Sequence, residues 1–395
     1  MVLLTIPRQF PLNDLESTLF ALFSDIVRHF RLHTVVRVAG GWVRDKVLNR
    51  PTKFDIDLTL SDMKGVEFAH KINDFLALQG KEGCRIAVIE QNPEKSKHLE
   101  TARIRINDCW IDLCNLRSET YTAGSRIPQI EMGTPEDDAL RRDFTINCLF
   151  YNIHTDHVED FTGRSFTDIS RGIVSTPLDV YTTLTDDPLR ILRAIRFAAR
   201  LRFKLDDSLR EGCRNEQVHL SLSDVVSRER IGTETMEMFE SDQVFTAINL
   251  FFELNLLGVV FFTKEFKHIY RKHFENQHGL VLKRCWLLTQ FMAKFQIPHT
   301  KLNRKFIFTA GLLLNITDEV ARIRKKQIPL IIFLCLEALK WAKCVSETVF
   351  RICSACNDFL SLSNTTSLPS RKDLGMILRR AGGDLEAVPC SSCSL

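Results

Sequence analysis

Apolar residues recur at helical spacing over residues 12–31, where Leu15, Leu19 and Ile26 share one side, and this periodicity predicts an amphipathic helix at the start of the fold. Shorter apolar or alternating runs follow this helix. They predict strands at residues 35–38, 55–60, 85–90, 102–106 and 109–113. Helices are predicted between them at residues 42–48 and 68–78, and Asn107-Asp108 is a hairpin turn signal. The pattern therefore predicts a small mixed sheet with helices on one face.

The pattern changes after residue 120. Gly, Pro, Ser and charged residues dominate residues 122–137 and predict a loop, after which helical spacing resumes at residues 138–149. A long helix is predicted from about residue 188 to residue 201, and beyond about residue 205 we find helical periodicity alone. Polar residues interrupt the apolar run at 244–262, so we expect a core helix there and no membrane span. The expected fold class is α+β.

Charge is distributed unevenly along the 395 residues, although the net charge is a modest +4. Residues 241–395 carry 21 Lys and Arg against 12 Asp and Glu, a balance of +9, whereas residues 1–240 carry 32 against 37, a balance of −5. An acidic first part and a basic second part suit a catalytic head joined to a body that holds a polyanion. Solvated helix faces are the alternative interpretation of the basic residues.

The twelve cysteines are scattered and form no disulfide framework, which favours a reducing, intracellular location. We find no secretory signal pattern, and we expect a location in the cytoplasm, the nucleus or the mitochondrion. Two CxxC pairs occur, Cys353/Cys356 and Cys390/Cys393. They would suit a zinc site, but the first lies in an apolar helical run and the second in a Ser-rich tail, which favours buried thiols and a loose end.

Candidate chemistry is concentrated in the segment GGWVRDKVLNRPTKFDIDL, residues 40–58. Side chains at i and i+2 of a strand point the same way, so Asp55 and Asp57 are expected on one face of their strand. Mg²⁺ is usually held by one or two such carboxylates together with substrate phosphates. Glycines let a backbone approach a phosphate closely. The segment is therefore interpreted as half of a nucleoside-triphosphate site that takes Mg²⁺.

Two further segments would complete such a site. Asp112 lies between apolar residues on a neighbouring predicted strand, where it would serve as a base on an attacking hydroxyl, brace the metal site or be a structural carboxylate. Arg141 and Arg142 follow the predicted loop, and guanidinium groups grip phosphate with fork geometry. Asp143 and Asn147 would then lie close to a ribose hydroxyl.

The predicted helix at residues 188–201 carries Arg190, Arg193, Arg196 and Arg200 along one broad face. Residues 190–203 contain no acid, so we expect an external anion as the partner of these arginines. Asp187 lies three residues before Arg190, and together they offer acceptors and donors that would meet the edge of cytosine or adenine.

Five motifs in order, GGWVRD, DIDL, RRDFTIN, DDPLRILRAIRFAAR and SRERI followed by Glu234, resemble those of the class II tRNA nucleotidyltransferases and bacterial-type poly(A) polymerases. The resemblance covers about residues 35–240 and looks closer to the eukaryotic CCA-adding form. Asp186-Asp187 stands where the family commonly has Glu-Asp. Glu229, Arg230 and Glu234 of the last motif are interpreted as an internal ion-pair brace.

The resemblance implies a polymerase-β-like nucleotidyltransferase head followed by a helical neck, body and tail. We place the head at residues 1–150, the neck with the nucleotide-selecting motif at 151–240 and the tRNA-binding body and tail at 241–395. The residues that the family's motifs assign to the site are Asp55 and Asp57 as ligands of two Mg²⁺ ions, Gly41, Arg44, Arg142, Arg193 and Arg196 as nucleotide contacts, and Asp187 and Arg190 as the pair that selects CTP or ATP.

The implied activity is template-independent addition of C, C and A to the 3′ end of tRNA from CTP and ATP. Three alternatives stay open at this point: a poly(A) polymerase or an enzyme adding CC or A alone, a non-catalytic RNA-binding protein, and a nucleotidyltransferase acting on protein or small molecules. The basic second part of the chain favours RNA over the last of these.

Overall fold

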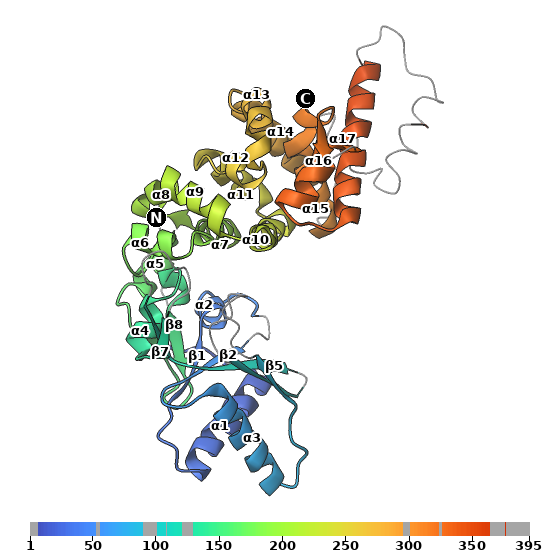
Figure 1. The fold of residues 1–395 in the computed structure, drawn as a ribbon. Helices are drawn as coiled ribbons and strands as arrows, with labels where there is room; N and C mark the ends of the chain where they lie inside the picture. The colour runs from blue at the N-terminus through green and yellow to red at the C-terminus, as the bar shows by residue number, and fades with distance from the viewer. Residues whose placement is uncertain are drawn as a thin grey trace. The chain divides into compact units, whose positions relative to one another are not determined.

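The computed structural model describes residues 7–52, 56–89, 101–107, 109–120, 129–294, 301–323, 326–363 and 376. The chain divides into two compact units, residues 1–187 and residues 188–395. The first unit holds the sheet predicted from the alternating segments, and the second is mainly helical (Figure 1). The α+β class is therefore confirmed. The division into head, neck and body at residues 150 and 240 stays a prediction.

The first unit is built on a seven-stranded mixed sheet with the order β3-β4-β5-β2-β1-β8-β9. Strands β2 and β5 run parallel, and the other neighbours are antiparallel. Its strands are β1 (Val36–Ala39), β2 (Ile56–Leu60), β3 (Ile86–Ile89), β4 (Thr101–Ile106), β5 (Cys109–Asn115), β8 (Leu149–Asn152) and β9 (His157–Asp160). The other elements of this unit are α1 (Asp14–His29), α2 (Gly41–Val47), α3 (Gly65–Leu78), β6 (Arg117–Thr120), β7 (Gln129–Met132), α4 (Pro135–Leu140), η2 (Thr145–Asn147), α5 (Ser165–Arg171), β10 (Ile173–Val174) and α6 (Val180–Asp186).

Helices α1 and α3 cover one face of this sheet (Figure 1). A capping box starts α1, because Asn13 and Glu16 each accept a hydrogen bond from the other's backbone N–H. Leu19 and Phe23 of α1 are fully buried, as are Leu58 of β2 and Leu113 of β5. Burial of this apolar layer leaves the opposite face of β2 and β5 available for polar side chains.

The turn between β1 and α2 needs glycine. Gly40 has φ 76° and ψ −133°, a conformation that is costly for a residue with a Cβ. A Cβ at Gly40 would also approach Nη1 of Arg142 to 3.2 Å. The first glycine of the sequence motif therefore sets the chain reversal, and it lets a guanidinium lie against the backbone there.

The helix predicted at residues 138–149 is wrong. Helix α4 ends at Leu140, η2 spans Thr145–Asn147, and residues 149–152 form β8, which pairs with β1. The carboxylate of Asp143 accepts hydrogen bonds from the Phe144 N–H and from the Asn147 side chain, and such local bonds compete with a continuing helix. The predicted loop at 122–137 is also partly wrong, because β7 pairs with β6 and α4 begins at Pro135; residues 121–128 lie outside the described residues.

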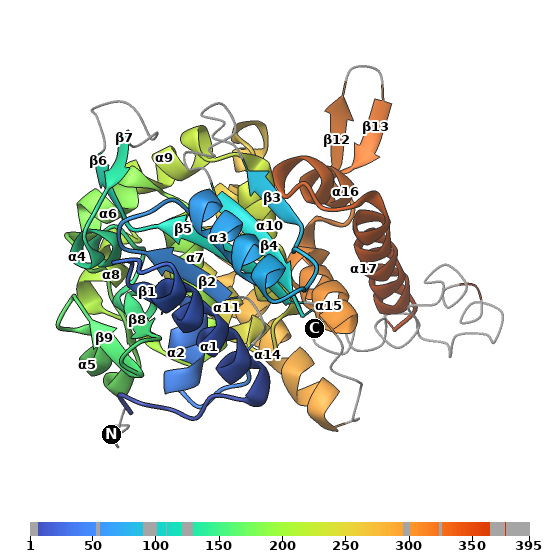
Figure 2. The ribbon, with the colours of Figure 1, turned by 90° about the horizontal axis from the view of Figure 1, so that it is seen from below.

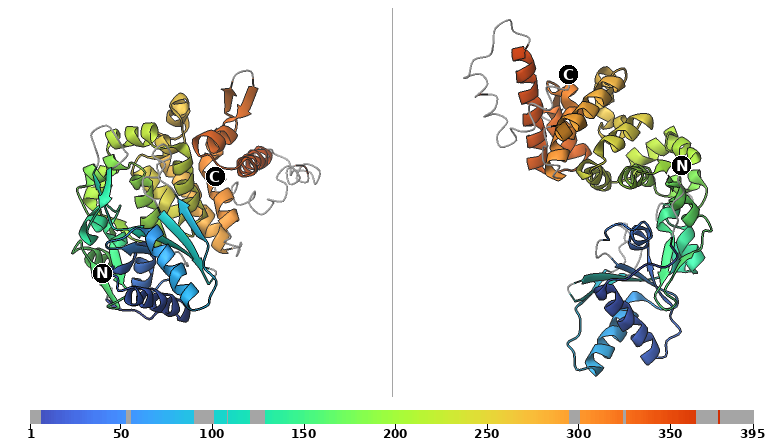
Figure 3. Two further views of the ribbon diagram at one scale, coloured as in Figure 1. Left: turned by 60° about the horizontal axis from the view of Figure 1, so that its bottom comes forward. Right: turned by 180° about the vertical axis from the view of Figure 1, so that it is seen from behind.

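The second unit is helical apart from short strands (Figures 2 and 3). Its elements are α7 (Arg190–Leu201), β11 (Lys204–Leu205), α8 (Asp207–Gly212), α9 (Glu216–Val225), α10 (Arg228–Glu240), α11 (Val244–Glu253), α12 (Leu257–Val260), η3 (Lys264–Phe266), α13 (Lys267–His273), α14 (His278–Lys294), α15 (Lys301–Leu313), η4 (Leu314–Ile316), β12 (Val320–Ile323), β13 (Lys326–Pro329), α16 (Leu330–Phe333), η5 (Leu334–Ala338) and α17 (Lys343–Ser363). The β12–β13 hairpin corrects the expectation of helices alone beyond residue 205.

The apolar run at 244–262 folds as two helices, α11 and α12. Asn255, with φ 57°, turns the chain between them. Phe251, Phe261 and Phe262 are buried, so the run belongs to the core of the second unit, as predicted. Among the described residues, no helix combines the length and the hydropathy needed to cross a lipid bilayer.

Candidate active site

Two carboxylates lie side by side on the face of the sheet opposite α1 and α3. Asp57 of β2 is paired in register with Asp112 of the parallel strand β5. The neighbours of Asp57 along β2, Ile56 and Leu58, are buried, whereas Asp57 itself is exposed. Asp55 lies outside the described residues, so the expected Asp55/Asp57 pair stays a prediction. Asp112 lies on the strand next to Asp57, as predicted, and the structure shows that the two residues are in register. The role of Asp112 stays a prediction.

The two carboxylates differ in their surroundings. Asp112 receives two hydrogen bonds from Arg103 of β4, from Nε at 2.6 Å and from Nη2 at 3.2 Å, so its charge is balanced within the sheet. Asp57 is more exposed, and its carboxylate oxygens, which are hard metal ligands, point away from the core. This donor set fits a small, hard divalent cation such as Mg²⁺, which binds through one or two carboxylates and takes its other ligands from water and phosphate.

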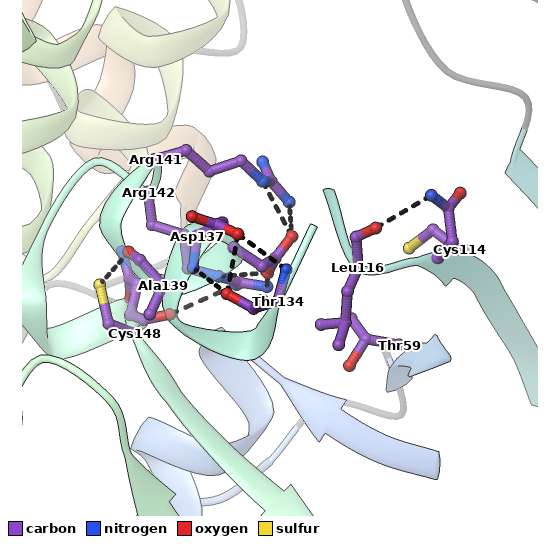
Figure 4. Close-up of polar contacts among 12 residues, drawn as sticks. Thr59, Cys114, Leu116, Thr134, Asp137, Ala139, Arg141, Arg142 and Cys148 are labelled. Atoms are coloured by element: carbon purple, nitrogen blue, oxygen red, sulfur yellow. Dashed lines mark hydrogen bonds and ion pairs between the residues drawn. The ribbon is translucent and has the colours of Figure 1, made fainter. Parts of the chain in front are cut away.

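Arg142 is held close to these carboxylates by a buried acid that the sequence analysis missed. Asp138 of α4 is fully buried and pairs with Arg142 at 2.7 Å and with Arg141. The two arginines are labelled in Figure 4. Burial alone would raise the pKa of Asp138, but the charges of Arg142 and Arg141 outweigh it and keep the pKa below its ordinary value. The spacing of three and four residues between Asp138 and the arginines is the signal in the sequence that would have found this pair.

The Arg142 side chain is largely buried, with 17% of it exposed. Burial would lower its pKa, but the charge of Asp138 raises it above the ordinary value, and Asp57 contributes in the same direction. The guanidinium carbon lies 5.0 Å from the centre of the Phe150 ring, and Nη1 donates to the Asn147 carbonyl at 3.3 Å. The arginine is therefore a fixed, permanent cation within electrostatic range of Asp57.

Arg44 of α2 is also buried and fixed. Its Nε donates to Asp45 at 2.8 Å, and its Nη1 donates to Oδ1 of Asn147, whose amide in turn donates to Asp143. A Cβ on Gly41 would lie 3.5 Å from Nη2 of Arg44. These hydrogen bonds join the GGWVRD motif, which contains Arg44, to the RRDFTIN motif, which contains Asp143 and Asn147. The predicted roles of Gly41 and Arg44 as nucleotide contacts stay predictions.

The Cys114 thiol at this face is not a reactive group. Burial, with a contribution from the charge of Asp57, raises the pKa of the Cys114 thiol to about 11, so the thiol is neutral near pH 7. In the second unit, Cys353 and Cys356 are buried in α17, and burial raises the pKa of Cys353 well above its ordinary value. No cluster of three or more candidate metal ligands occurs within the part of the chain that the structure describes. Cys390 and Cys393 lie outside it.

The arginines of α7 have an acidic partner from another helix. Arg196 donates from Nε to Glu234 of α10 at 2.6 Å and pairs with Glu237 at 3.1 Å, and Arg193 lies 3.6 Å from Glu234. Both guanidinium groups also lie over the ring of Phe197. An external anion was expected because α7 itself contains no acid. Instead, Glu234 of α10 is an acidic partner from another helix. Glu234 thereby orients both arginines.

Replacing Glu234 with alanine should lower the free energy of unfolding by about 1–3 kcal/mol, because it leaves a largely buried Arg196 without its main partner. Glu237 still pairs with Arg196, which limits the loss. Thermal unfolding followed by circular dichroism measures the effect. Glu237→Ala is the matched control, since Glu237 is mostly exposed and its loss should cost less than about 1 kcal/mol. Equal effects of the two variants would contradict the assigned role of Glu234.

Asp187 and Arg190 flank the boundary between the two units. Asp187 follows the last residue of α6, and Arg190 is the first residue of α7. Both side chains are half-buried. The buried residues of α7 include Ile191, Leu192 and Ile195, so the helix presents its arginines on the opposite side, as the periodicity predicts. The base-reading role of this pair stays a prediction.

Comparison with known proteins places these motifs in a family. Residues 36–175, which lie within the first unit, match the model of the poly(A) polymerase head domain. Over nearly the whole chain, the sequence is 34% identical to the mitochondrial CCA tRNA nucleotidyltransferase of Candida glabrata, covering 97% of this chain and 79% of that protein. It is also 34% identical to the mitochondrial CCA tRNA nucleotidyltransferase of Saccharomyces cerevisiae, covering 91% of this chain and 71% of the relative. The chain belongs to the CCA tRNA nucleotidyltransferase family, and the resemblance predicted from the motifs is confirmed.

Solved structures agree on the fold. The Thermotoga maritima CCA-adding enzyme complexed with tRNA matches with a TM-score of 0.67 at 17% identity, over 99% of this chain and 82% of that one. A CCA-adding enzyme in complex with CTP matches with a TM-score of 0.66 at 18% identity, over 97% and 79% of the two chains. At these identities the likeness concerns the fold, and it extends through the second unit as well as the head.

Proposed function

We propose that this protein adds C, C and A to the 3′ end of tRNA, without a template, from CTP and ATP and with release of pyrophosphate. The observation that carries the proposal is the open sheet face where Asp57 and Asp112 lie in register, with the largely buried cation Arg142 nearby. Membership in the family, with relatives matched over most of their length, supports tRNA as the acceptor.

Asp55 and Asp57 would hold Mg²⁺ at this face. When bound, the metal favours ionisation of the attacking hydroxyl and neutralises charge on the departing pyrophosphate. Arg142, fixed by Asp138, supplies permanent positive charge for a triphosphate beside Asp57. Because glycine has no Cβ, Gly40 and Gly41 would let a phosphate approach the backbone closely. The chain's own contribution is therefore preorganised charge at the reacting phosphate.

The nucleotide is selected elsewhere in the proposed scheme. Asp187 and Arg190 read the base edge, while Arg193 and Arg196, oriented by Glu234, contact the nucleotide from α7. A hydrogen-bond acceptor beside a donor matches the edges of both cytosine and adenine. Asp187 and Arg190 would therefore serve both CTP and ATP. Residues 151–240 would form the neck that carries this motif, and the basic residues of 241–395 would hold the tRNA.

The proposed location is a reducing compartment, because the described cysteines form no disulfide and several are buried thiols. The names of the two yeast relatives make the mitochondrion one such compartment. Fractionation of the source cells with an antibody to the chain tests this, and recovery from the secreted fraction would contradict it.

Product length decides which addition the protein performs. Transcribed tRNA lacking its terminal CCA is incubated with CTP alone, with ATP alone and with both, in the presence of Mg²⁺. We expect two residues added with CTP alone, none with ATP alone and three with both. Long tails with ATP would identify a poly(A) polymerase, and a product that stops after two residues with both nucleotides would identify a CC-adding enzyme. Absence of any product would favour a non-catalytic RNA-binding protein.

A further inference from the structure

An exposed tryptophan lies on the same sheet face as Asp57 and Asp112. Trp110 lies near the start of β5 and is 39% exposed, whereas its neighbour Ile111 is fully buried on the other face. Arg105, directly opposite in register on β4, and Arg103 both place their guanidinium carbons within 6 Å of the Trp110 ring centre, at 5.9 and 5.8 Å. An exposed indole offers a face on which a base can stack, and Arg105 beside it supplies positive charge for the adjoining phosphate, whereas Arg103 is paired with Asp112 and braces the ring.

This platform is continuous with the proposed reaction centre. Trp110 and Asp112 are two residues apart on one strand, so they share a face about 6.6 Å apart along β5. Arg103 connects them directly, because it lies over the Trp110 ring and donates both hydrogen bonds to Asp112. The ring therefore borders the carboxylates themselves, on strands of the same sheet.

The order of the strands indicates which substrate the platform receives. Strand β2, with Asp57, lies between β1 and β5. Arg142, the proposed phosphate-binding cation, lies beside Gly40, at the end of β1, and Trp110 lies on β5, on the opposite side of Asp57. In phosphoryl-type transfer the attacking and leaving oxygens are roughly in line across the reacting phosphorus. If the pyrophosphate leaves toward Arg142, the attacking hydroxyl approaches from the side of β5.

We propose that Trp110, with Arg103 and Arg105, stacks the 3′-terminal base of the nucleic-acid acceptor and so positions its 3′-hydroxyl beside Asp57 and Asp112. The inference rests on the proposed function and adds an acceptor-positioning residue to it. The base of the incoming nucleotide is assigned elsewhere, to Asp187 and Arg190, so the platform serves the acceptor alone.

Steady-state kinetics of the full-length Trp110→Ala variant test this assignment. The KM for tRNA lacking its terminal CCA should rise about 5- to 150-fold, the factor expected for loss of one base–aromatic stack. The KM for CTP should stay within about threefold of that of the unaltered protein, because CTP does not contact the ring. Trp110→Phe should recover most of the acceptor affinity, since phenylalanine retains a stacking face.

A second measurement separates stacking from general damage to the sheet. A tRNA whose 3′-terminal base is replaced by 2-aminopurine is bound without nucleotides, and stacking quenches the fluorescence of this base. We expect quenching with the unaltered protein and with Trp110→Phe, and loss of quenching with Trp110→Ala. Leu78→Ala is the control, because Leu78 is an exposed apolar residue at the end of α3, which covers the other face.

Any of three outcomes with Trp110→Ala would overturn the inference: an unchanged acceptor KM, a rise in the KM for CTP instead, or a quenching signal that survives the substitution. Failure of the proposed function would be distinguishable, because the unaltered protein itself would then extend no acceptor. An equal rise in acceptor KM for Leu78→Ala would likewise show that the platform has no special role.

Discussion

Asp57→Ala should lower nucleotide incorporation by about a thousandfold or more. A metal site supplies several kcal/mol of charge stabilisation in the transition state, and each ~1.4 kcal/mol is tenfold in rate. Asp57 is exposed on its strand and contributes nothing to the core, so the fold should persist. Retention of tRNA should be nearly intact, because the basic residues that would hold it lie at 241–395. Single-turnover incorporation of labelled CTP and a tRNA filter-binding assay measure the two properties.

Asp62→Ala is the matched control for this variant, since Asp62 is another exposed carboxylate, five residues further along the chain. It should incorporate CTP at the rate of the unaltered protein. Asp55→Ala should behave like Asp57→Ala if the two residues share the metal. Activity of Asp57→Ala equal to that of the control would remove the metal assignment, and a parallel loss of tRNA binding would mean that the substitution acts on the fold.

Replacing Asp187 or Arg190 with alanine should loosen the choice of nucleotide before it removes the chemistry. A good bidentate contact to a base edge is worth about 1–3 kcal/mol of discrimination, or about 5- to 150-fold in relative kcat/KM. GTP and UTP, whose edges have the reverse pattern, should become usable substrates to that extent. The measurement is kcat/KM for each of the four nucleotides with one acceptor tRNA.

Arg202→Ala provides the comparison for these variants, because Arg202 is exposed and follows the last residue of the same helix α7. Its nucleotide preference should match that of the unaltered protein. Should the Asp187 and Arg190 variants keep the full preference for CTP and ATP while losing rate, the pair would have a structural role, and the base would be read by other residues.

Much of the first unit could be predicted from local patterns. The five predicted strands, which correspond to β1–β5, agree with the structure to within about two residues, because alternation of buried and exposed side chains, as at Asp57 and Ile56, reports directly on a sheet with one covered face. Strands β8 and β9 of the same sheet were not predicted. The pairing of strands could not be predicted in this way. Asp57 and Asp112 lie in register because β2 and β5 run parallel, and that neighbourhood is a property of the topology.

The failures have physical causes of two kinds. Helical spacing at residues 138–149 was a misleading local signal, since Asp143 bonds to nearby donors and Leu149 begins a strand that pairs with β1. The partner of Arg193 and Arg196 could not be predicted from the local sequence, because Glu234 lies on a different helix. The order of the motifs identified the family where single residues did not, since each motif alone has several structural explanations.

The most direct test of the account is template-free incorporation of radiolabelled CTP and ATP into tRNA that lacks its terminal CCA, with Mg²⁺ and with EDTA in place of it. We expect the unaltered protein to extend the tRNA by three residues with Mg²⁺ and by none with EDTA. No incorporation with Mg²⁺, or extension that persists undiminished in EDTA, would contradict the proposal that this sheet face is a metal-dependent nucleotidyltransferase site.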